Sequence, residues 1–338
     1  MRLFDAVPAL APIGDDVVRF STEPIPGHER YHVARDADNH PAVLITGLAG
    51  QAAERPSPIV LEHLTVQADV ECVIRRGDGS SRQERCIVVR CRSGDRRLHE
   101  YFLRSSAAVV LAVGPQPSPK QVREAVDTLV ELFRIMTTLP RRSAQGLWAE
   151  LFVMWQARDV RCLARAWHLE PEDRYDFCAG NERLEVKSAS QHRRIHEFSL
   201  DQLRPPAGVR VVVASLLVEP SAGGMSLRDL ADIIRSRIGG EAELSLRFDR
   251  VLGLALGSAW RNASENRFDE ALAGSSLQFY RADSVPAVAL PLPREVTDVR
   301  FRADLTAVEP VDPAVLLSEG DLISAAVREL GGHGARRR

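Results

Sequence analysis

Short runs of apolar and β-branched residues alternate with turns along the first third of the chain. Four of these runs have the composition of strands, and they lie at residues 31–35, 42–45, 70–74 and 86–90. Residues 76–79 and 93–95 supply turns that contain glycine and aspartate. No helix is expected before residue 117. The pattern therefore predicts an antiparallel β domain over residues 1–116.

Helical spacing begins after the Gly-Pro-Gln-Pro segment at 114–117. Ser118, Pro119 and Gln121 provide the N-cap, the first-turn proline and the capping-box glutamine of a helix start. An apolar stripe with helical period follows and ends near Pro140. A second helix is predicted over residues 144–157.

The rest of the chain mixes strand and helix patterns. Ser199 and Gln202 fit a capping box at the start of a short helix. Residues 209–218 are apolar and β-branched, which is typical of a strand buried on both faces, and a helix is predicted from Ser226 to Gly239. Further predicted elements are a helix at 241–256, strands at 276–283 and 297–305, and a last helix at 320–330. We therefore expect an α+β chain whose second domain, residues 117–330, is an α/β mixed sheet flanked by helices, followed by a disordered tail at 331–338.

Residues 174–187 show the most informative pattern, two short strands around a Gly180-Asn181 turn. The hairpin register places Asp176 opposite Glu185. Strand alternation then divides the side chains between two faces. The predicted core face holds Tyr175, Phe177, Leu184 and Val186, and the polar face holds Asp176, Glu185 and Lys187.

Two adjacent carboxylates repel each other unless a cation lies between them. Mg²⁺ prefers hard oxygen ligands and keeps several waters, so Asp176, Glu185 and the carbonyl of Val186 are candidate ligands. Lys187 would orient the attacking water or stabilise charge in the transition state. This layout is typical of a metal-dependent phosphodiesterase. The alternative is a solvated polar face on which Glu185 and Lys187 merely pair.

Glu150 is a carboxylate within an apolar helical stripe. On a helix it shares a face with Leu147, Leu151 and Met154. A buried carboxylate needs a cation partner or a chemical role, so Glu150 either completes the acidic cluster or pairs with an arginine at the edge of the stripe.

Four further residues are candidates for binding a substrate. They are Gln191, Arg193, Arg194 and His196. Ordinary surface positions, or a capping role for His196, are the alternatives. The same choice holds for Arg141 and Arg142, whose guanidinium groups are candidates for contacts to a nucleic-acid backbone.

Composition limits the possible partners. The net charge of -2 gives no global sign of nucleic-acid binding, so phosphate contacts must come from local basic clusters. The start of the chain lacks a secretory pattern, and no apolar run is long enough to span a bilayer. Five cysteines without CxxC spacing indicate reduced thiols. A cytoplasmic protein with no membrane contact is expected.

The helical Glu150, then Asp176, then Glu185-Val186-Lys187 resembles the PD-(D/E)XK nuclease superfamily of restriction, repair and recombination enzymes. Tyr175 replaces the proline that names the motif, and the interval from Asp176 to Glu185 is short. Four longer segments also resemble a bacterial family of this superfamily across most of the chain. They are Tyr-His-Val-x-Arg-Asp at 31–36, Gly-Leu-x-x-Glu-Leu at 146–151, Leu-Glu-Val-Lys-Ser at 184–188 and His-x-Phe-Ser-x-x-Gln-Leu at 196–203.

The resemblance implies a restriction-endonuclease-like fold and a Mg²⁺- or Mn²⁺-dependent endonuclease that hydrolyses DNA phosphodiester bonds. It also implies a prokaryotic anti-phage defence setting with helicase-like or other ATPase partners, and it is compatible with a homo-oligomer. The competing hypothesis is a catalytically inactive nuclease fold that serves as a DNA-binding or scaffolding subunit of a defence complex.

Overall fold

The computed structural model describes residues 19–47, 58–75, 80–138, 140, 142–168, 174–190, 193–289, 291–293 and 295–327. The chain divides into two compact units, Met1–Thr138 and Leu139–Arg338. This division lies later than residue 116, because two helices pack with the first sheet. The expected turn at 76–79 and the expected tail at 331–338 lie outside the described residues.

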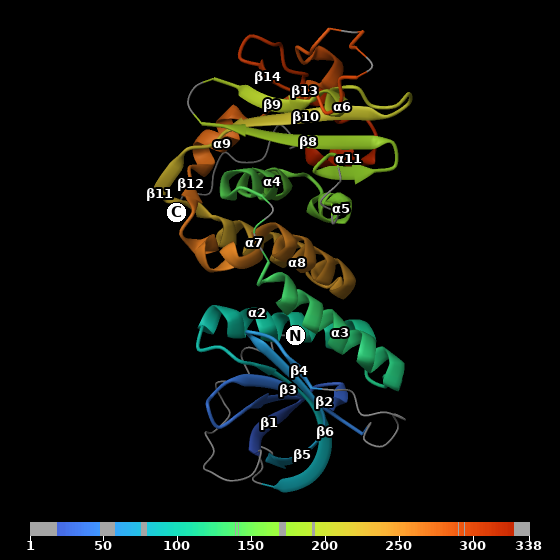
Figure 1. The fold of residues 1–338 in the computed structure, drawn as a ribbon, viewed down its shortest axis with the longest axis vertical. Helices are drawn as coiled ribbons and strands as arrows, with labels where there is room; N and C mark the ends of the chain where they lie inside the picture. Colours follow the sequence, from blue (N-terminus) through green and yellow to red (C-terminus); the bar gives the residue numbers. More distant parts are fainter. Residues whose placement is uncertain are drawn as a thin grey trace. The chain divides into compact units, whose positions relative to one another are not determined.

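The described part of the first unit contains six strands and two helices, which Figure 1 shows. They are β1 (Arg19–Ile25), β2 (His28–Arg35), β3 (Pro41–Thr46), β4 (Ile59–Val60), β5 (Leu64–Arg75), β6 (Ser81–Cys91), α2 (Arg96–Val113) and α3 (Pro119–Ile135). All four strands that the sequence predicts in this region are present, within β2, β3, β5 and β6.

The strands of the first unit form a sheet that closes on itself. Their order is β1-β2-β3-β6-β5-β4, and β1 also pairs with β5 in parallel. All the other pairings are antiparallel. Phe20, Leu44, Cys72 and Val88 belong to the core cluster that this closed sheet shares. The antiparallel β region is thus confirmed, with one parallel pairing that alternation alone does not reveal.

The expectation of no helix before residue 117 is wrong. Asp95 caps α2 by accepting a hydrogen bond from the backbone N–H of Arg97, and Gly114 ends the helix with a φ of 86°. The second half of α2 is a run of small and apolar residues that are buried without helical alternation, from Ser105 to Val110. That run has no single apolar stripe, so periodicity does not identify it as a helix.

The second unit begins with two helices and continues with alternating strands and helices (Figure 1). Its helices are α4 (Ala144–Gln156), α5 (Val160–Ala166), α6 (Leu200–Leu203), α7 (Leu227–Ile238), α8 (Ala242–Leu256), η2 (Gly257–Ser264), α9 (Glu270–Ser276), η3 (Ala282–Ser284), α10 (Pro313–Leu316) and α11 (Asp321–Ala326). Its strands are β7 (Phe177–Ala179), β8 (Glu182–Ala189), β9 (Ile195–Ser199), β10 (Arg210–Leu217), β11 (Pro220–Ser226), β12 (Arg267–Phe268), β13 (Gln278–Arg281) and β14 (Arg300–Asp304).

A mixed four-stranded sheet forms the centre of the second unit. Its order is β13-β10-β8-β7, with β8 and β10 parallel and the outer pairs antiparallel. Figure 1 shows α4 and α5 below this sheet, with α7 and α8 in a further layer, and α4 contacts both β8 and α7. The two-stranded sheet of β9 and β14 lies on the other face. The mixed sheet flanked by helices is therefore confirmed.

Both faces of the central sheet are covered by apolar side chains. Leu184 and Val212 belong to the larger cluster, which also contains residues of α4, α5, α7, α8 and α11. Val211 and Val213 belong to a second cluster with Phe198 of β9. β8 therefore carries its polar side chains between two apolar layers, which makes its charged residues expensive to leave without partners.

The hairpin also supports α11. Glu182 is buried, and its carboxylate accepts a hydrogen bond of 2.8 Å from the backbone N–H of Leu322 in α11. Arg210 of β10 neutralises the same carboxylate at 3.0 Å. A side chain at Gly320 would collide with the carboxylate of Glu182, which would then have to move from its place beside α11.

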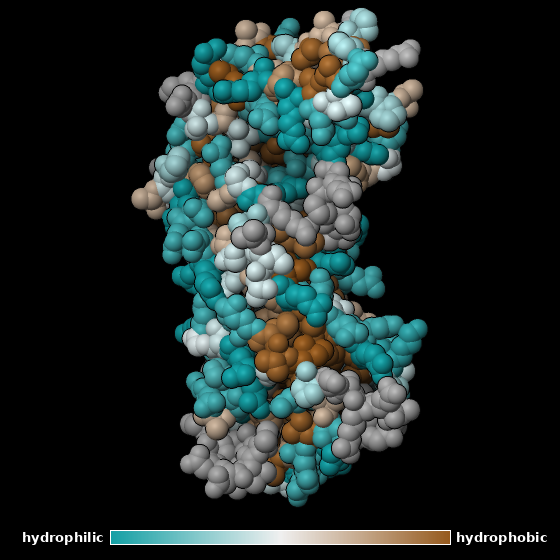
Figure 2. All heavy atoms as spheres, viewed as in Figure 1, coloured by the Kyte–Doolittle hydropathy of each residue, from teal (hydrophilic) through white to brown (hydrophobic). Residues whose placement is uncertain are grey.

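Hydrophilic side chains cover most of the face that Figure 2 shows, and apolar side chains gather over the region of α2 and α3. Within the described ranges, no helix has the length and apolar character that crossing a membrane requires.

Candidate active site

The β7–β8 hairpin positions Asp176. Its register pairs Phe177 with Leu184, Cys178 with Arg183 and Ala179 with Glu182, as the sequence predicts. The ladder ends at Phe177, and Asp176 turns its carboxylate toward β8. Its Oδ2 accepts a hydrogen bond of 2.8 Å from the backbone N–H of Val186. Asp176 therefore reaches the segment of β8 that carries Glu185 and Lys187.

Tyr175 does not lie on the face that strand alternation assigns to it. Phe177 and Leu184 are in the larger core cluster, whereas Tyr175 packs in the second cluster with Phe198. Its hydroxyl donates to the carbonyl of Gln202 at 3.2 Å. The physical reason is that residues 174–176 bend instead of continuing the strand, so their side chains do not alternate with those of β7.

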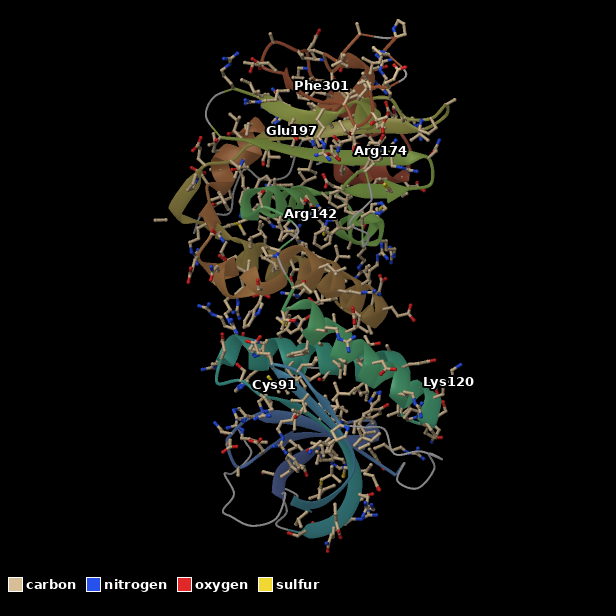
Figure 3. All side chains as sticks on the ribbon, in the orientation of Figure 1. Cys91, Lys120, Arg142, Arg174, Glu197 and Phe301 are labelled. Carbon is tan, nitrogen blue, oxygen red and sulfur yellow. The ribbon has the colours of Figure 1, made fainter. Side chains whose placement is uncertain are left out.

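Helix α4 brings Glu150 to the same region from below the sheet. Ser143 caps the helix, and the apolar face around Glu150 packs into the core. Arg142, which immediately precedes the cap, joins the two elements (Figure 3). Its Nη1 contacts the Oε1 of Glu150 and donates to the Oδ1 of Asp176 at 3.0 Å. Trp167 donates its indole N–H to the Oε2 of Glu150 at 2.8 Å.

Glu185 is held by a cation and an amide. The Nζ of Lys187 lies 2.7 Å from its Oε1, and the Nε2 of Gln202 donates to the same oxygen at 2.7 Å. Gln202 also completes the capping box of α6 with Ser199. The ammonium of Lys187 lies 5.2 Å from the ring centre of Phe198, a cation–π contact that limits its freedom.

Burial makes it unfavourable for the carboxylates of this cluster to carry negative charge. Glu150 and Glu185 are each 4% exposed. Burial and the neighbouring charge of Asp176 raise the pKa of Glu150 and of Glu185 from 4.5 to about 8. Arg142 and Trp167 act in the opposite direction on the pKa of Glu150, and Lys187 and Arg142 on that of Glu185. Removal from water thus outweighs the contacts with the two cations. Three carboxylates with two cationic side chains leave the cluster short of positive charge when all are ionised.

The donor chemistry fits a divalent cation such as Mg²⁺ or Mn²⁺. All three side chains offer carboxylate oxygens, and the raised pKa values of Glu150 and Glu185 indicate a demand for positive charge that such an ion satisfies. Of these carboxylates, Glu185 contacts Lys187, and Asp176 contacts Arg142. The backbone N–H of Val186 binds Asp176, and the role of its carbonyl as a ligand stays a prediction.

Within the described ranges, Glu150, Asp176 and Glu185 do not bring three ligand atoms within 4.8 Å of one another, whereas a different group does. Asp36, Asp38 and His40 offer ligand atoms that all lie within 4.8 Å of one another. They form the turn between β2 and β3, where the Oδ1 of Asp36 accepts from the backbone N–H of His40 at 2.8 Å. Arg90 lies 3.4 Å from the other oxygen of Asp36. Turn formation and this ion pair account for the cluster without a bound ion.

The predicted substrate-binding residues are not gathered at the acidic cluster. His196 is 2% exposed, and its Nε2 lies 2.8 Å from the hydroxyl of Ser215. Burial and the charge of Lys187 lower the pKa of His196 to about 4. Arg194 is buried as well and donates to the carbonyl of Ser215 at 2.8 Å. Arg193 is exposed and pairs with Asp304 at 2.6 Å, and Gln191 lies outside the described residues.

Sequence reasoning did not assign Arg142 and Gln202 to the site. The sequence places Arg142 only in a basic pair with Arg141. An arginine directly before the N-cap of a helix that carries a buried glutamate could, however, have been predicted to pair with that glutamate. Gln202 was explained by its capping box alone. Its second hydrogen bond, to Glu185, depends on how α6 lies beside β8 and leaves no trace in the local pattern.

Glu150 of α4, Asp176, Glu185 of β8 and Lys187, two residues after Glu185, are the residues that carry the resemblance to the PD-(D/E)XK motif. The chain belongs to the family described as "Putative PD-(D/E)XK family member, (DUF4420)", whose model matches residues 16–306. No curated protein and no solved structure matches the chain.

Proposed function

We propose that the chain is a divalent-cation-dependent nuclease that hydrolyses DNA phosphodiester bonds. The observation that carries this proposal is the meeting of Asp176, Glu185 and Lys187 in one hairpin, with Glu150 joined to Asp176 through Arg142. Family membership supports the same assignment.

Each side chain has a role in this proposal. Asp176 and Glu185, with the Val186 carbonyl, would hold Mg²⁺ or Mn²⁺, and Glu150 completes the acidic cluster or holds a second ion. The ion, when bound, screens the phosphate and lowers the pKa of a water. Lys187, fixed by its contact with Glu185, orients the attacking water and stabilises negative charge on the phosphate oxygens.

The test is nicking of supercoiled plasmid by purified protein with Mg²⁺, Mn²⁺ or EDTA, with single-stranded DNA and RNA assayed in parallel. Asp176→Asn and Lys187→Ala should each reduce cleavage by about 100-fold or more. Glu197→Gln, at an exposed carboxylate that pairs with Arg300, is the matched control and should cleave normally. The proposal is wrong if no DNA form is cut with either metal and Asp176→Asn loses no metal binding. Cleavage of RNA alone would replace the substrate class.

A second function has support from one observation. Every carboxylate of the cluster already has a partner within the chain, namely Arg142, Trp167, Lys187 or Gln202. A catalytically inactive nuclease fold that binds DNA or scaffolds a complex could retain such a cluster for stability. This alternative predicts DNA binding that is unchanged by EDTA and by Lys187→Ala.

The setting in anti-phage defence, and the helicase-like or other ATPase partners, rest on the resemblance described above. Affinity purification of the full chain from bacterial cells that express it, and a comparison of phage infection with and without it, test them. Co-purification of an ATPase, and loss of phage resistance in Asp176→Asn, are the expected results.

A further inference from the structure

Arg142 contacts two of the three carboxylates in the acidic cluster, Glu150 of α4 and Asp176 beside the hairpin. One nitrogen, Nη1, contacts the Oε1 of Glu150 and the Oδ1 of Asp176. The other oxygen of Asp176 accepts the backbone N–H of Val186. Both oxygens of Asp176 are thus engaged, and the one that is not bound to backbone is bound to a positive charge.

A divalent ion and Arg142 would be drawn to the same oxygens. A cation placed within ligand distance of Asp176 while the guanidinium stays in contact would put like charges a few ångströms apart, which is strongly unfavourable in a buried site. Glu150 and Asp176 can therefore bind either the guanidinium of Arg142 or a divalent ion, but not both at the same time.

Arg142 can move away from Glu150 and Asp176 while other hydrogen bonds keep the two carboxylates in place. Its side chain is 27% exposed, whereas those of Glu150 and Asp176 are 6% and 14% exposed. Glu150 keeps the hydrogen bond from Trp167, and Asp176 keeps the one from Val186. Arg142 is thus the most exposed side chain of these three, and each carboxylate keeps one hydrogen bond that does not involve Arg142.

We propose that Arg142 is an internal competitor for the divalent cation: it neutralises Glu150 and Asp176 in the metal-free chain and leaves Asp176 when the ion binds. This inference rests on the proposed metal-dependent function and adds its regulation. The metal affinity is then set low by the chain itself. Arg142 belongs to the second unit, as do the carboxylates that it contacts.

The experiment is titration of the full chain with Mn²⁺ by calorimetry, together with thermal unfolding in EDTA and in Mn²⁺. Arg142→Gln should bind Mn²⁺ at least about tenfold more tightly than the original chain, because a competing charge is gone. In EDTA the same variant should unfold at a lower temperature, because two buried carboxylates lose their counter-ion, and Mn²⁺ should restore its stability. Arg142→Lys keeps the positive charge but not the planar guanidinium, and it should bind Mn²⁺ with intermediate affinity. This variant replaces Arg142→Gln in the test if Arg142→Gln does not fold.

Arg174→Gln is the matched control. Arg174 lies near the hairpin (Figure 3) and its side chain pairs with Asp201 at 3.3 Å, away from the carboxylates. Its removal should leave Mn²⁺ affinity unchanged within about twofold. Equal affinity of Arg142→Gln, Arg142→Lys and the original chain, or weaker binding by both variants, would overturn the inference and leave the nuclease proposal intact. Absence of Mn²⁺ binding in every variant would overturn both.

Discussion

Glu150 shows how one buried carboxylate can satisfy two expectations that seemed to exclude each other. Its place on an apolar helical face predicts either a member of the acidic cluster or a partner for an arginine. In the structure the arginine itself contacts Asp176, so the ion pair belongs to the cluster. The residue type and its periodicity identified the need for a cation, and the tertiary fold determined which cation meets it.

The raised pKa values predict how stability changes with pH in the absence of metal. Glu150 and Glu185 rise from 4.5 to about 8 on folding. The folded chain therefore binds more protons than the unfolded chain in this interval, and the contribution of these groups is full below pH 4.5 and is lost as the pH rises through about 8. Urea unfolding in EDTA at several pH values should show this loss.

The variant Glu150→Gln isolates the contribution of one group. Glutamine does not titrate, so the fall in unfolding free energy between about pH 5 and about pH 8 should be smaller than in the original chain. Glu197→Gln, at an exposed position, should leave the fall unchanged. If all three proteins lose stability equally across this range, Glu150 is ionised throughout and the assigned cause is wrong.

Gln202 positions Glu185 through a hydrogen bond, and this role can be tested separately from its role in capping α6. Gln202→Leu removes the hydrogen bond to Glu185 and the capping-box contact, whereas Ser199→Ala removes the cap and keeps the bond to Glu185. We expect Mn²⁺ affinity to fall by roughly tenfold in Gln202→Leu, as for other partners that orient a metal ligand. Ser199→Ala should cost about 1 kcal/mol of stability with no change in affinity. Equal losses of affinity would show that placement of α6 matters instead.

Among the helices, those with local start signals were the predictable ones. The capping boxes at Ser118, Ser199 and Ser226 all form, and α3, α6 and α7 begin directly after them. The strand β10 was recognisable as a continuous apolar run. The sheet of β9 with β14 pairs segments about a hundred residues apart, and such pairing is specified by tertiary contacts more than by local sequence.

The β11–β12 pair explains why Gly224 is a glycine. A Cβ at this position would lie 2.0 Å from the backbone oxygen of Phe268, whereas a Cβ at Gly223 meets nothing within 4 Å. Gly224→Ala should therefore lower the free energy of unfolding by about 3 kcal/mol, because backbone atoms must move. Gly223→Ala should change it by less than about 0.5 kcal/mol. Urea unfolding curves compare the two.

This effect should reach the acidic cluster. The indole of Trp148 donates to the carbonyl of Met225 at 2.9 Å, which ties α4 to β11. A displaced β11 thus disturbs the helix that carries Glu150, and Gly224→Ala should also weaken Mn²⁺ binding. Normal binding in a destabilised Gly224→Ala would mean that α4 is held by its core contacts alone.

At the scale of the whole molecule, the two units have separate cores. The core cluster of the closed sheet lies in residues of the first unit, and both clusters around the mixed sheet lie in the second. Each unit thus meets the usual condition for a domain. The change from strand to helix patterns near residue 117 revealed two regions, but it placed α3 with the wrong one, because packing decides membership and periodicity does not.

All the side chains assigned to the acidic cluster belong to the second unit. Arg142, Glu150, Asp176, Glu185 and Lys187 follow Thr138 in the chain. We therefore expect a fragment of residues 139–338 to bind Mn²⁺ as the full chain does. If the first unit contributes to DNA recognition, the fragment should bind DNA more weakly than the full chain. The difference should shrink at high salt if the fragment has lost contacts to phosphate.

Calorimetry with Mn²⁺ and fluorescence anisotropy with a labelled duplex measure the two properties on the same preparations. The fragment carrying Asp176→Asn controls for metal bound elsewhere and should lose the Mn²⁺ signal. A folded fragment that binds no Mn²⁺ while the full chain does would show that the first unit contributes to the site. A fragment with unchanged DNA affinity would assign recognition to the second unit, and leave the closed sheet of the first for assembly.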